Sequence, residues 1–177
     1  MSSEFQKRKI AGVFYALDVD QDGYLEEEDF QSLTDRWNEI RGYQEGSPEH
    51  GRMTAIMMGW WQALLAASDL DRDNRVTLDE VMVVVDQLPY VRDQVEATAA
   101  SMFEAVDEDG DGVVSPAEYN QMIVAWKGSP VDTEGVFRFL DANGDGHLSR
   151  DEFVALWADF WIGDDQASPS KWVFGPF

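Results

Sequence analysis

The chain lacks cysteine and has few basic residues. None of its 177 residues is cysteine, which excludes a disulfide framework, a thiolate zinc site and a cysteine nucleophile. Only 13 residues are Lys or Arg against 35 Asp or Glu, and the net charge of -22 leaves no basic face for nucleic acid or an anionic membrane. No apolar run approaches the roughly 20 residues that span a bilayer. We therefore expect partners other than nucleic acid or membranes.

The acidic residues are concentrated in four windows of twelve residues. The windows cover 18–29, 69–80, 107–118 and 141–152, and read DVDQDGYLEEED, DLDRDNRVTLDE, DEDGDGVVSPAE and DANGDGHLSRDE. They hold 21 of the 35 acidic residues. A solvated acidic surface would not repeat the same internal spacing four times, so the windows predict a repeated binding site.

The spacing within each window matches the oxygen ligands that calcium requires. Such a loop supplies side-chain oxygens at positions 1, 3 and 5, a backbone carbonyl at 7, a ligand or bridging water at 9 and a carboxylate at 12. Position 9 is Ser115 in the third window and Ser149 in the fourth. The predicted ligands are Asp18, Asp20, Asp22, the Tyr24 carbonyl and Asp29; Asp69, Asp71, Asp73, the Arg75 carbonyl and Glu80; Asp107, Asp109, Asp111, the Val113 carbonyl and Glu118; and Asp141, Asn143, Asp145, the His147 carbonyl and Glu152.

Two windows depart from this pattern. The first ends on Asp29 where glutamate is usual, and the shorter side chain favours a smaller site that also tolerates Mg²⁺. Glu26 at position 9 can add a carboxylate there. The second window has Asn74 at position 6, where the third and fourth have Gly112 and Gly146. Because asparagine enters the left-handed region more readily than most residues, we expect a strained but intact loop.

Apolar residues at helical spacing flank every window, which predicts an all-α chain of four helix–loop–helix units in two pairs. One helix should end near Ile40, and a long one should span 48–68. Apolar residues at position 8 can form short paired strands between neighbouring loops: Leu25, Val76, Val114 and Leu148. We place the N-terminal pair at 1–88 and the C-terminal pair at 89–177. The apolar tail 171–177 should be non-helical and fold back between the halves.

The windows resemble EF-hands, and the whole chain resembles the sarcoplasmic calcium-binding proteins and calexcitins. The segments EFQKRKIAGVFYALD, IRGYQEGSPEHGRM and DEFVALWADFWIGDDQASPSKWVFGPF carry this likeness. The resemblance implies one compact globule with the two pairs packed face to face, and it supports Asp29 as a ligand. Several members have lost the ligands of one loop, often the second, whereas the second window here is intact.

The sequence shows no catalytic triad, phosphate loop or nucleotide fingerprint, so we expect a non-enzymatic protein. Two functions remain. A cytoplasmic, monomeric calcium buffer or signal modulator fits an aromatic core whose halves cover each other. The alternative is a sensor that exposes an apolar groove to a target protein when calcium binds.

Overall fold

The computed structural model describes residues 2–176, and helices account for most of them. The helices of these residues are α1 (Glu4–Leu17), α2 (Glu27–Arg41), α3 (Pro48–Ser68), α4 (Leu78–Val85), α5 (Arg92–Val106), α6 (Pro116–Lys127), α7 (Glu134–Leu140) and α8 (Arg150–Ile162). Two 3₁₀ helices, η1 (Leu88–Val91) and η2 (Pro169–Trp172), and two short strands, β1 (Val113–Val114) and β2 (Leu148–Ser149), complete the described elements. The prediction of an all-α fold of four helix–loop–helix units is confirmed.

The helix boundaries follow local sequence signals. Helix α3 begins at Pro48 behind Ser47, whose hydroxyl accepts a hydrogen bond from the His50 amide. It spans the predicted 48–68. Helix α2 ends at Arg41, one residue beyond the prediction, because Gly42 adopts a left-handed conformation with φ of 67°.

Neighbouring loops are joined through the apolar residues at position 8, as predicted. Leu25 and Val76 form an antiparallel bridge, with N···O distances of 2.8 and 3.0 Å. Strands β1 and β2 pair antiparallel, with Val114 opposite Leu148. The strand ladder therefore fixes the spacing of the loops within each pair.

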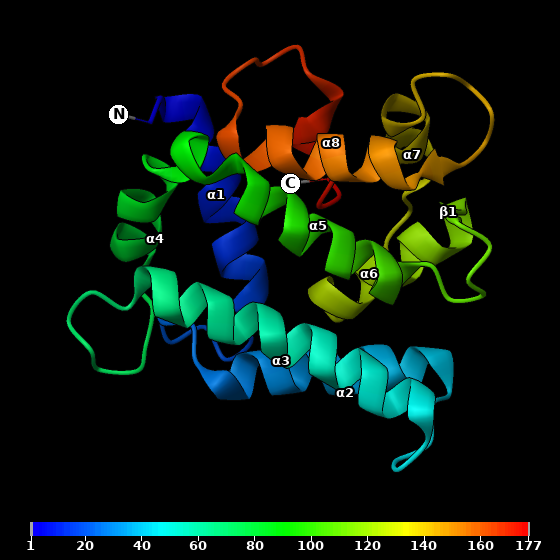
Figure 1. The fold of residues 1–177 in the computed structure, drawn as a ribbon, viewed down its shortest axis with the longest axis horizontal. Coiled ribbons are helices and arrows are strands. Elements are labelled where there is room, and N and C mark those ends of the chain that lie inside the picture. The colour runs from blue at the N-terminus through cyan, green and yellow to red at the C-terminus, as the bar shows by residue number, and fades with distance from the viewer. Residues whose placement is uncertain (1, 177) are drawn as a thin grey trace.

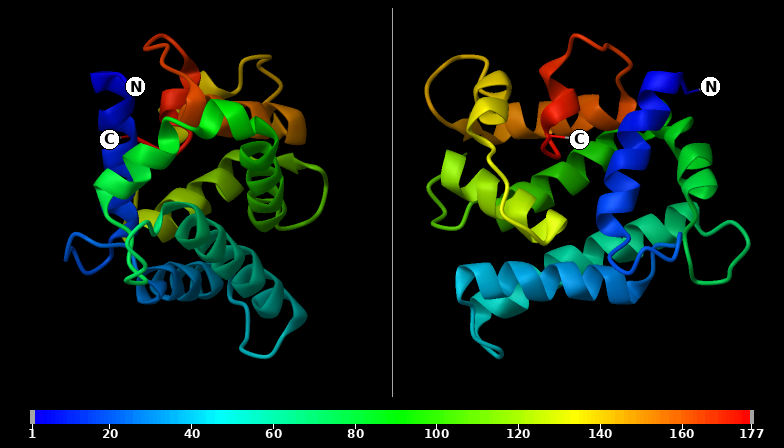
Figure 2. Two further views of the ribbon diagram at one scale, coloured as in Figure 1. Left: turned by 60° about the vertical axis from the view of Figure 1, so that its left-hand side comes forward. Right: turned by 180° about the vertical axis from the view of Figure 1, so that it is seen from behind.

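The two halves pack against each other around a tryptophan cluster. Figure 1 shows α2 and α3 side by side along the lower edge, with α5 and α8 above them and α1 running between the two layers. The reverse view in Figure 2 shows the same arrangement. Trp60 of α3 contacts Trp126 of α6 and Trp157 of α8 at ring-centroid distances of 5.7 and 5.6 Å. The fold is compact, and the boundary near residue 89 stays a prediction.

The tail is buried, but contrary to the prediction it is not non-helical throughout. Lys171 and Trp172 belong to η2, so the chain makes a tight turn there. Phe174 is 4% exposed and packs on Trp126, Trp157 and Phe160 at 5.0, 4.9 and 4.5 Å. These partners belong to the C-terminal half, whose core the tail closes. Phe177, also predicted to be buried, lies outside the described residues.

Candidate metal centres

The first aspartate of each loop organises the turn that follows it. The position-6 amide donates to the Oδ2 of this aspartate in all four loops, at 3.0 Å in loop one and 2.8 Å in loop four. Position 6 has a positive φ throughout: Gly23 91°, Asn74 66°, Gly112 86° and Gly146 86°. Asn74 thus adopts the predicted left-handed conformation and keeps the loop intact.

The aspartates at positions 3 and 5 are oriented by backbone amides two residues further on. In the third loop the amide of Asp111 donates to Asp109 at 3.1 Å, and that of Val113 donates to Asp111 at 3.0 Å. The other three loops repeat both bonds. These bonds fix the orientation of the side chains at positions 3 and 5 in each loop.

Three of the loops bring carboxylates close together. Carboxylate oxygens lie within 4.8 Å of one another in three groups, namely Asp18, Asp20 and Asp22; Asp69, Asp71 and Asp73; and Asp107, Asp109 and Glu118. No lysine or arginine of the described chain forms an ion pair with these carboxylates. Like charges this close repel, so a divalent cation with a preference for oxygen fits each group.

In loops one to three the residue at position 12 joins the two ends of its loop by hydrogen bonds. In the third loop Glu118 accepts from the amide of Glu108 through Oε1 and from the amide of Ser115 through Oε2, both at 2.8 Å. The shorter Asp29 accepts from the equivalent amides of Val19 and Glu26, both at 2.9 Å. Asp29 therefore occupies the place of the glutamates despite lacking one methylene.

The residue at position 9 begins the next helix. Thr77, Ser115 and Ser149 are N-caps, and each side-chain oxygen accepts from the amide at position 12. The structure shows the hydroxyls of Ser115 and Ser149 serving as helix caps, and their role as ligands or water bridges stays a prediction. The sequence carries this signal, since Ser-x-x-Glu is a capping box.

Loops one and two share an ion pair. Arg75 Nε lies 2.7 Å from Glu26 Oε1, and its guanidinium lies over the Tyr24 ring, 5.1 Å from the centroid. The Glu26 carboxylate thus contacts the neighbouring loop through Arg75, while its side chain also takes part in the capping box with Asp29 of its own loop. Spacing within a single window could not reveal this pair, because it depends on the register between two loops.

The position-12 carboxylates of loops one and two have pKa values shifted in opposite directions. The pKa of Asp29 is raised, mainly because burial penalises its charge, although hydrogen bonds from Glu26 and Val19 oppose the rise. For Glu80, burial also favours the neutral acid, but hydrogen bonds from Thr77 and Leu70 outweigh it and lower the pKa. Glu80 is therefore more readily ionised than Asp29, and the ionised form is the one that binds a cation.

Loop four has one carboxylate fewer than loop three. Position 3 is Asn143, whose Oδ1 accepts from the Asp145 amide at 2.9 Å and whose Nδ2 donates to Glu152 Oε1 at 2.8 Å. Asp141 accepts from the amides of Gly144 and Gly146. The oxygen donors lie in the same order as in the other loops, with a lower negative charge.

Comparison with known proteins agrees with this geometry. The EF hand family model matches residues 10–34, 99–123 and 134–157, around loops one, three and four. The beta chain of the sarcoplasmic calcium-binding protein of Penaeus sp. is 26% identical, over 93% of this chain and 92% of its own length. The chain is an EF-hand protein related to the sarcoplasmic calcium-binding proteins. It is therefore a non-enzymatic, calcium-binding EF-hand protein.

Solved structures share the fold over nearly the whole EF-hand chain. The sarcoplasmic calcium-binding protein from amphioxus superposes with a TM-score of 0.74 at 19% identity, covering 100% of both chains. The coelenterazine-binding protein from Renilla muelleri gives a TM-score of 0.78 at 22% identity, covering 99% of this chain and 100% of its own. None of the described helices is both long and apolar enough to cross a membrane.

Proposed function

We propose that this EF-hand protein is a calcium buffer with four cation sites. The ligands are those predicted from the spacing, with Asp29, Glu80, Glu118 and Glu152 at position 12. Support comes from the repeated hydrogen bonds that orient positions 1, 3, 5 and 12 in every loop. The proposal includes loop two, which lies outside the segments matched by the family model.

The observation that carries the buffer role is the covering of the apolar helix faces. A calcium sensor exposes a methionine-rich groove. Here Met53, Met57, Met102 and Met122 are at most 3% exposed, and Phe174 of the tail fills the space between Trp126 and Trp157. A protein whose apolar faces already contact each other has little to offer a target helix.

We propose that loop one also accepts Mg²⁺. Asp29 accepts from the same two amides as the longer Glu80 and Glu118 with a side chain one methylene shorter, so we infer that the first turn of α2 lies closer to this loop. A smaller oxygen cage suits Mg²⁺, which prefers six ligands at about 2.0–2.1 Å.

Titration calorimetry tests the number of sites. We expect four calcium ions per chain, and one fewer in each of the variants Asp29→Asn, Glu80→Gln, Glu118→Gln and Glu152→Gln. Asp151→Asn is the matched control, because Asp151 lies at position 11 and should leave four sites. A wild-type stoichiometry of two or three would refute the four-site proposal.

Chromatography on phenyl-agarose separates buffer from sensor. A buffer should pass through the column equally in calcium and in EDTA, because no apolar groove opens. Calmodulin, retained in calcium and released by EDTA, is the positive control. Calcium-dependent retention of this protein would support the sensor.

A further inference from the structure

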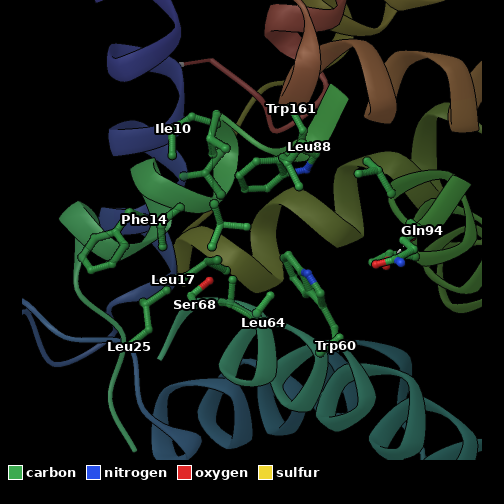
Figure 3. Close-up of a pocket in the computed structure, with 18 of the residues that line it drawn as sticks. Ile10, Phe14, Leu17, Leu25, Trp60, Leu64, Ser68, Leu88, Gln94 and Trp161 are labelled. Carbon is green, nitrogen blue, oxygen red and sulfur yellow. Dashed lines mark hydrogen bonds between the residues drawn. The ribbon is translucent and has the colours of Figure 1, made fainter. Parts of the chain in front are cut away.

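A cavity of about 220 Å³ lies between the helices, and Leu17, Leu25 and Ser68 in its wall adjoin loops one and two. Helices α1, α3, α4, α5 and α8 and the 3₁₀ helix η1 contribute its walls (Figure 3). Apolar side chains such as Ile10, Phe14, Leu64 and Trp161 form most of the lining, and no charged residue belongs to it. Packed protein interiors contain few voids larger than a water molecule, so a cavity of this size needs an explanation.

One polar group in the wall of the cavity has no partner. Ser68 is fully buried, and its hydroxyl forms no hydrogen bond with any described residue. A serine near a helix end can bond back to the carbonyl four residues earlier, but Ser68 does not. Leaving a buried hydroxyl unsatisfied costs free energy. Its presence in an apolar wall indicates a hydrogen-bonding partner that enters from outside.

The exposed residues of the lining lie on α3 and α5, and we infer that the cavity opens there. The residues there are small or polar: Ala63 and Ala67 are exposed on α3, and Gln94 and Thr98 lie on α5, the first exposed and the second half-buried. Figure 3 shows Ser68 and Gln94 on different sides of the pocket, with Trp60 nearer to Gln94. A molecule that enters past Ala63 can therefore reach Ser68 at the inner side.

We propose that this cavity binds a neutral, mostly apolar small molecule of about two rings that carries one hydroxyl or carbonyl group. The apolar walls favour the ring system. Ser68 accepts a hydrogen bond from the hydroxyl or donates one to the carbonyl. A carboxylate or an amine is excluded because no lining residue carries a charge to neutralise it.

The size of the ligand follows from the volume. An engineered apolar cavity of roughly 150 Å³ binds benzene. The present cavity of about 220 Å³ is larger, so it holds a second ring. No proposed calcium ligand lines this cavity, but Ser68 directly precedes Asp69, the first ligand of loop two. Small-molecule binding is therefore measured both with and without calcium, apart from the calcium stoichiometry.

The experiment uses 1-naphthol as the probe, with naphthalene and 1-naphthoate as matched analogues that lack or ionise the polar group. Each is titrated against the full chain by calorimetry, once in calcium and once in EDTA. We expect 1-naphthol to bind one molecule per chain in at least one of the two conditions. It should bind about tenfold more tightly than naphthalene, as expected for one buried hydrogen bond, and 1-naphthoate should bind more weakly still.

Two variants locate the binding. Ser68→Ala should lower the affinity for 1-naphthol about tenfold and leave that for naphthalene unchanged. Ala63→Trp should abolish binding of both by closing the opening, whereas Ala66→Trp, on an exposed position of α3 outside the lining, should bind like the wild type. The comparison of ligands on the wild-type protein remains decisive if Ser68→Ala does not fold.

Several results would overturn the proposal. These are no binding of 1-naphthol in either condition, equal affinity for 1-naphthol and naphthalene, preference for 1-naphthoate, or unchanged binding in Ala63→Trp. Concentration-dependent dimerisation that disappears in Ala63→Trp would show that a second copy covers the opening, and would also overturn it.

Discussion

Loops one and two place ordinary residues where loops three and four place glycine. At position 4 the backbone is left-handed in every loop, with φ of 61° at Gln21, 65° at Arg72, 70° at Gly110 and 73° at Gly144. Glycine adopts this conformation freely, whereas a side chain makes it cost about 1–2 kcal/mol. The N-terminal pair therefore carries backbone strain that the C-terminal pair avoids.

The same difference changes how the first ligand is held. In loops three and four the glycine amide at position 4 donates to the first aspartate, at 2.9 Å to Asp107 and 3.0 Å to Asp141. In loops one and two the position-5 amide donates instead, at 3.2 Å to Asp18 and 3.1 Å to Asp69. Loops that share the same pattern of ligands can therefore differ in how firmly the backbone holds the first ligand before the cation binds. We expect weaker calcium binding in the N-terminal pair.

The largest effect concerns the tail, which closes the core of the C-terminal half. Phe174→Ala should lower the free energy of unfolding by about 3–5 kcal/mol, because it leaves a cavity among Trp126, Trp157 and Phe160. Urea denaturation measures this. Phe139→Ala is the control, since Phe139 is 66% exposed and its loss should cost under about 0.5 kcal/mol. Equal effects would mean that the tail does not close the core.

A smaller effect is expected where the two halves are linked by Arg41 at the end of α2. Its guanidinium donates to the carbonyls of Ala105 and Val106 at 2.8 and 2.6 Å, at the end of α5 just before loop three, and its side chain is 1% exposed. Arg41→Met should cost about 2–3 kcal/mol of stability, because these carbonyls lose a charged donor.

Calorimetry on the same variant should show weaker calcium binding at loop three, because Arg41 holds the helix that enters it. Arg92→Met is the control, because Arg92 forms only an exposed pair with Glu96. If calcium affinity changed at loop one alone, Arg41 would not connect the halves.

Substituting glycine at position 4 of loops one and two tests whether backbone strain distinguishes the N-terminal pair from the C-terminal pair. Gln21→Gly and Arg72→Gly should each stabilise the calcium-bound protein by about 0.5–1 kcal/mol, the strain removed minus the entropy cost of glycine. Thermal unfolding in calcium measures the gain. The reverse change, Gly144→Ala, should destabilise by a similar amount. If neither Gln21→Gly nor Arg72→Gly gained stability, backbone strain would not explain the difference between the N-terminal and C-terminal pairs.

The smallest effect is a pH dependence of the calcium-free protein. Burial raises the pKa of Asp29 above its value in the unfolded chain. Its stabilising contribution is therefore complete below the unfolded pKa and is lost as the pH rises through the folded pKa.

Relative to Asp29→Asn, the calcium-free wild type should become less stable as the pH rises from about 4 toward 7. Urea denaturation in EDTA at a series of pH values measures the difference. Parallel curves for the two proteins would contradict it.

The sequence alone determined the four loops and the helices around them. Oxygen ligands at fixed intervals within twelve residues are a local property, and so are the helix starts at Pro48 and Pro116, which follow the capping residues Ser47 and Ser115. The bridge between Leu25 and Val76 was predictable because position 8 repeats in register.

Only the tertiary structure decided the features that join distant parts of the chain. The Glu26–Arg75 pair, the contacts of Arg41 with the end of α5, and the turn that places Phe174 against Trp157 join residues that the sequence does not relate. The unpartnered Ser68 hydroxyl became visible only with the cavity around it. The physical reason is that ligand spacing and capping depend on neighbours a few residues apart, whereas packing depends on which surfaces the fold brings together.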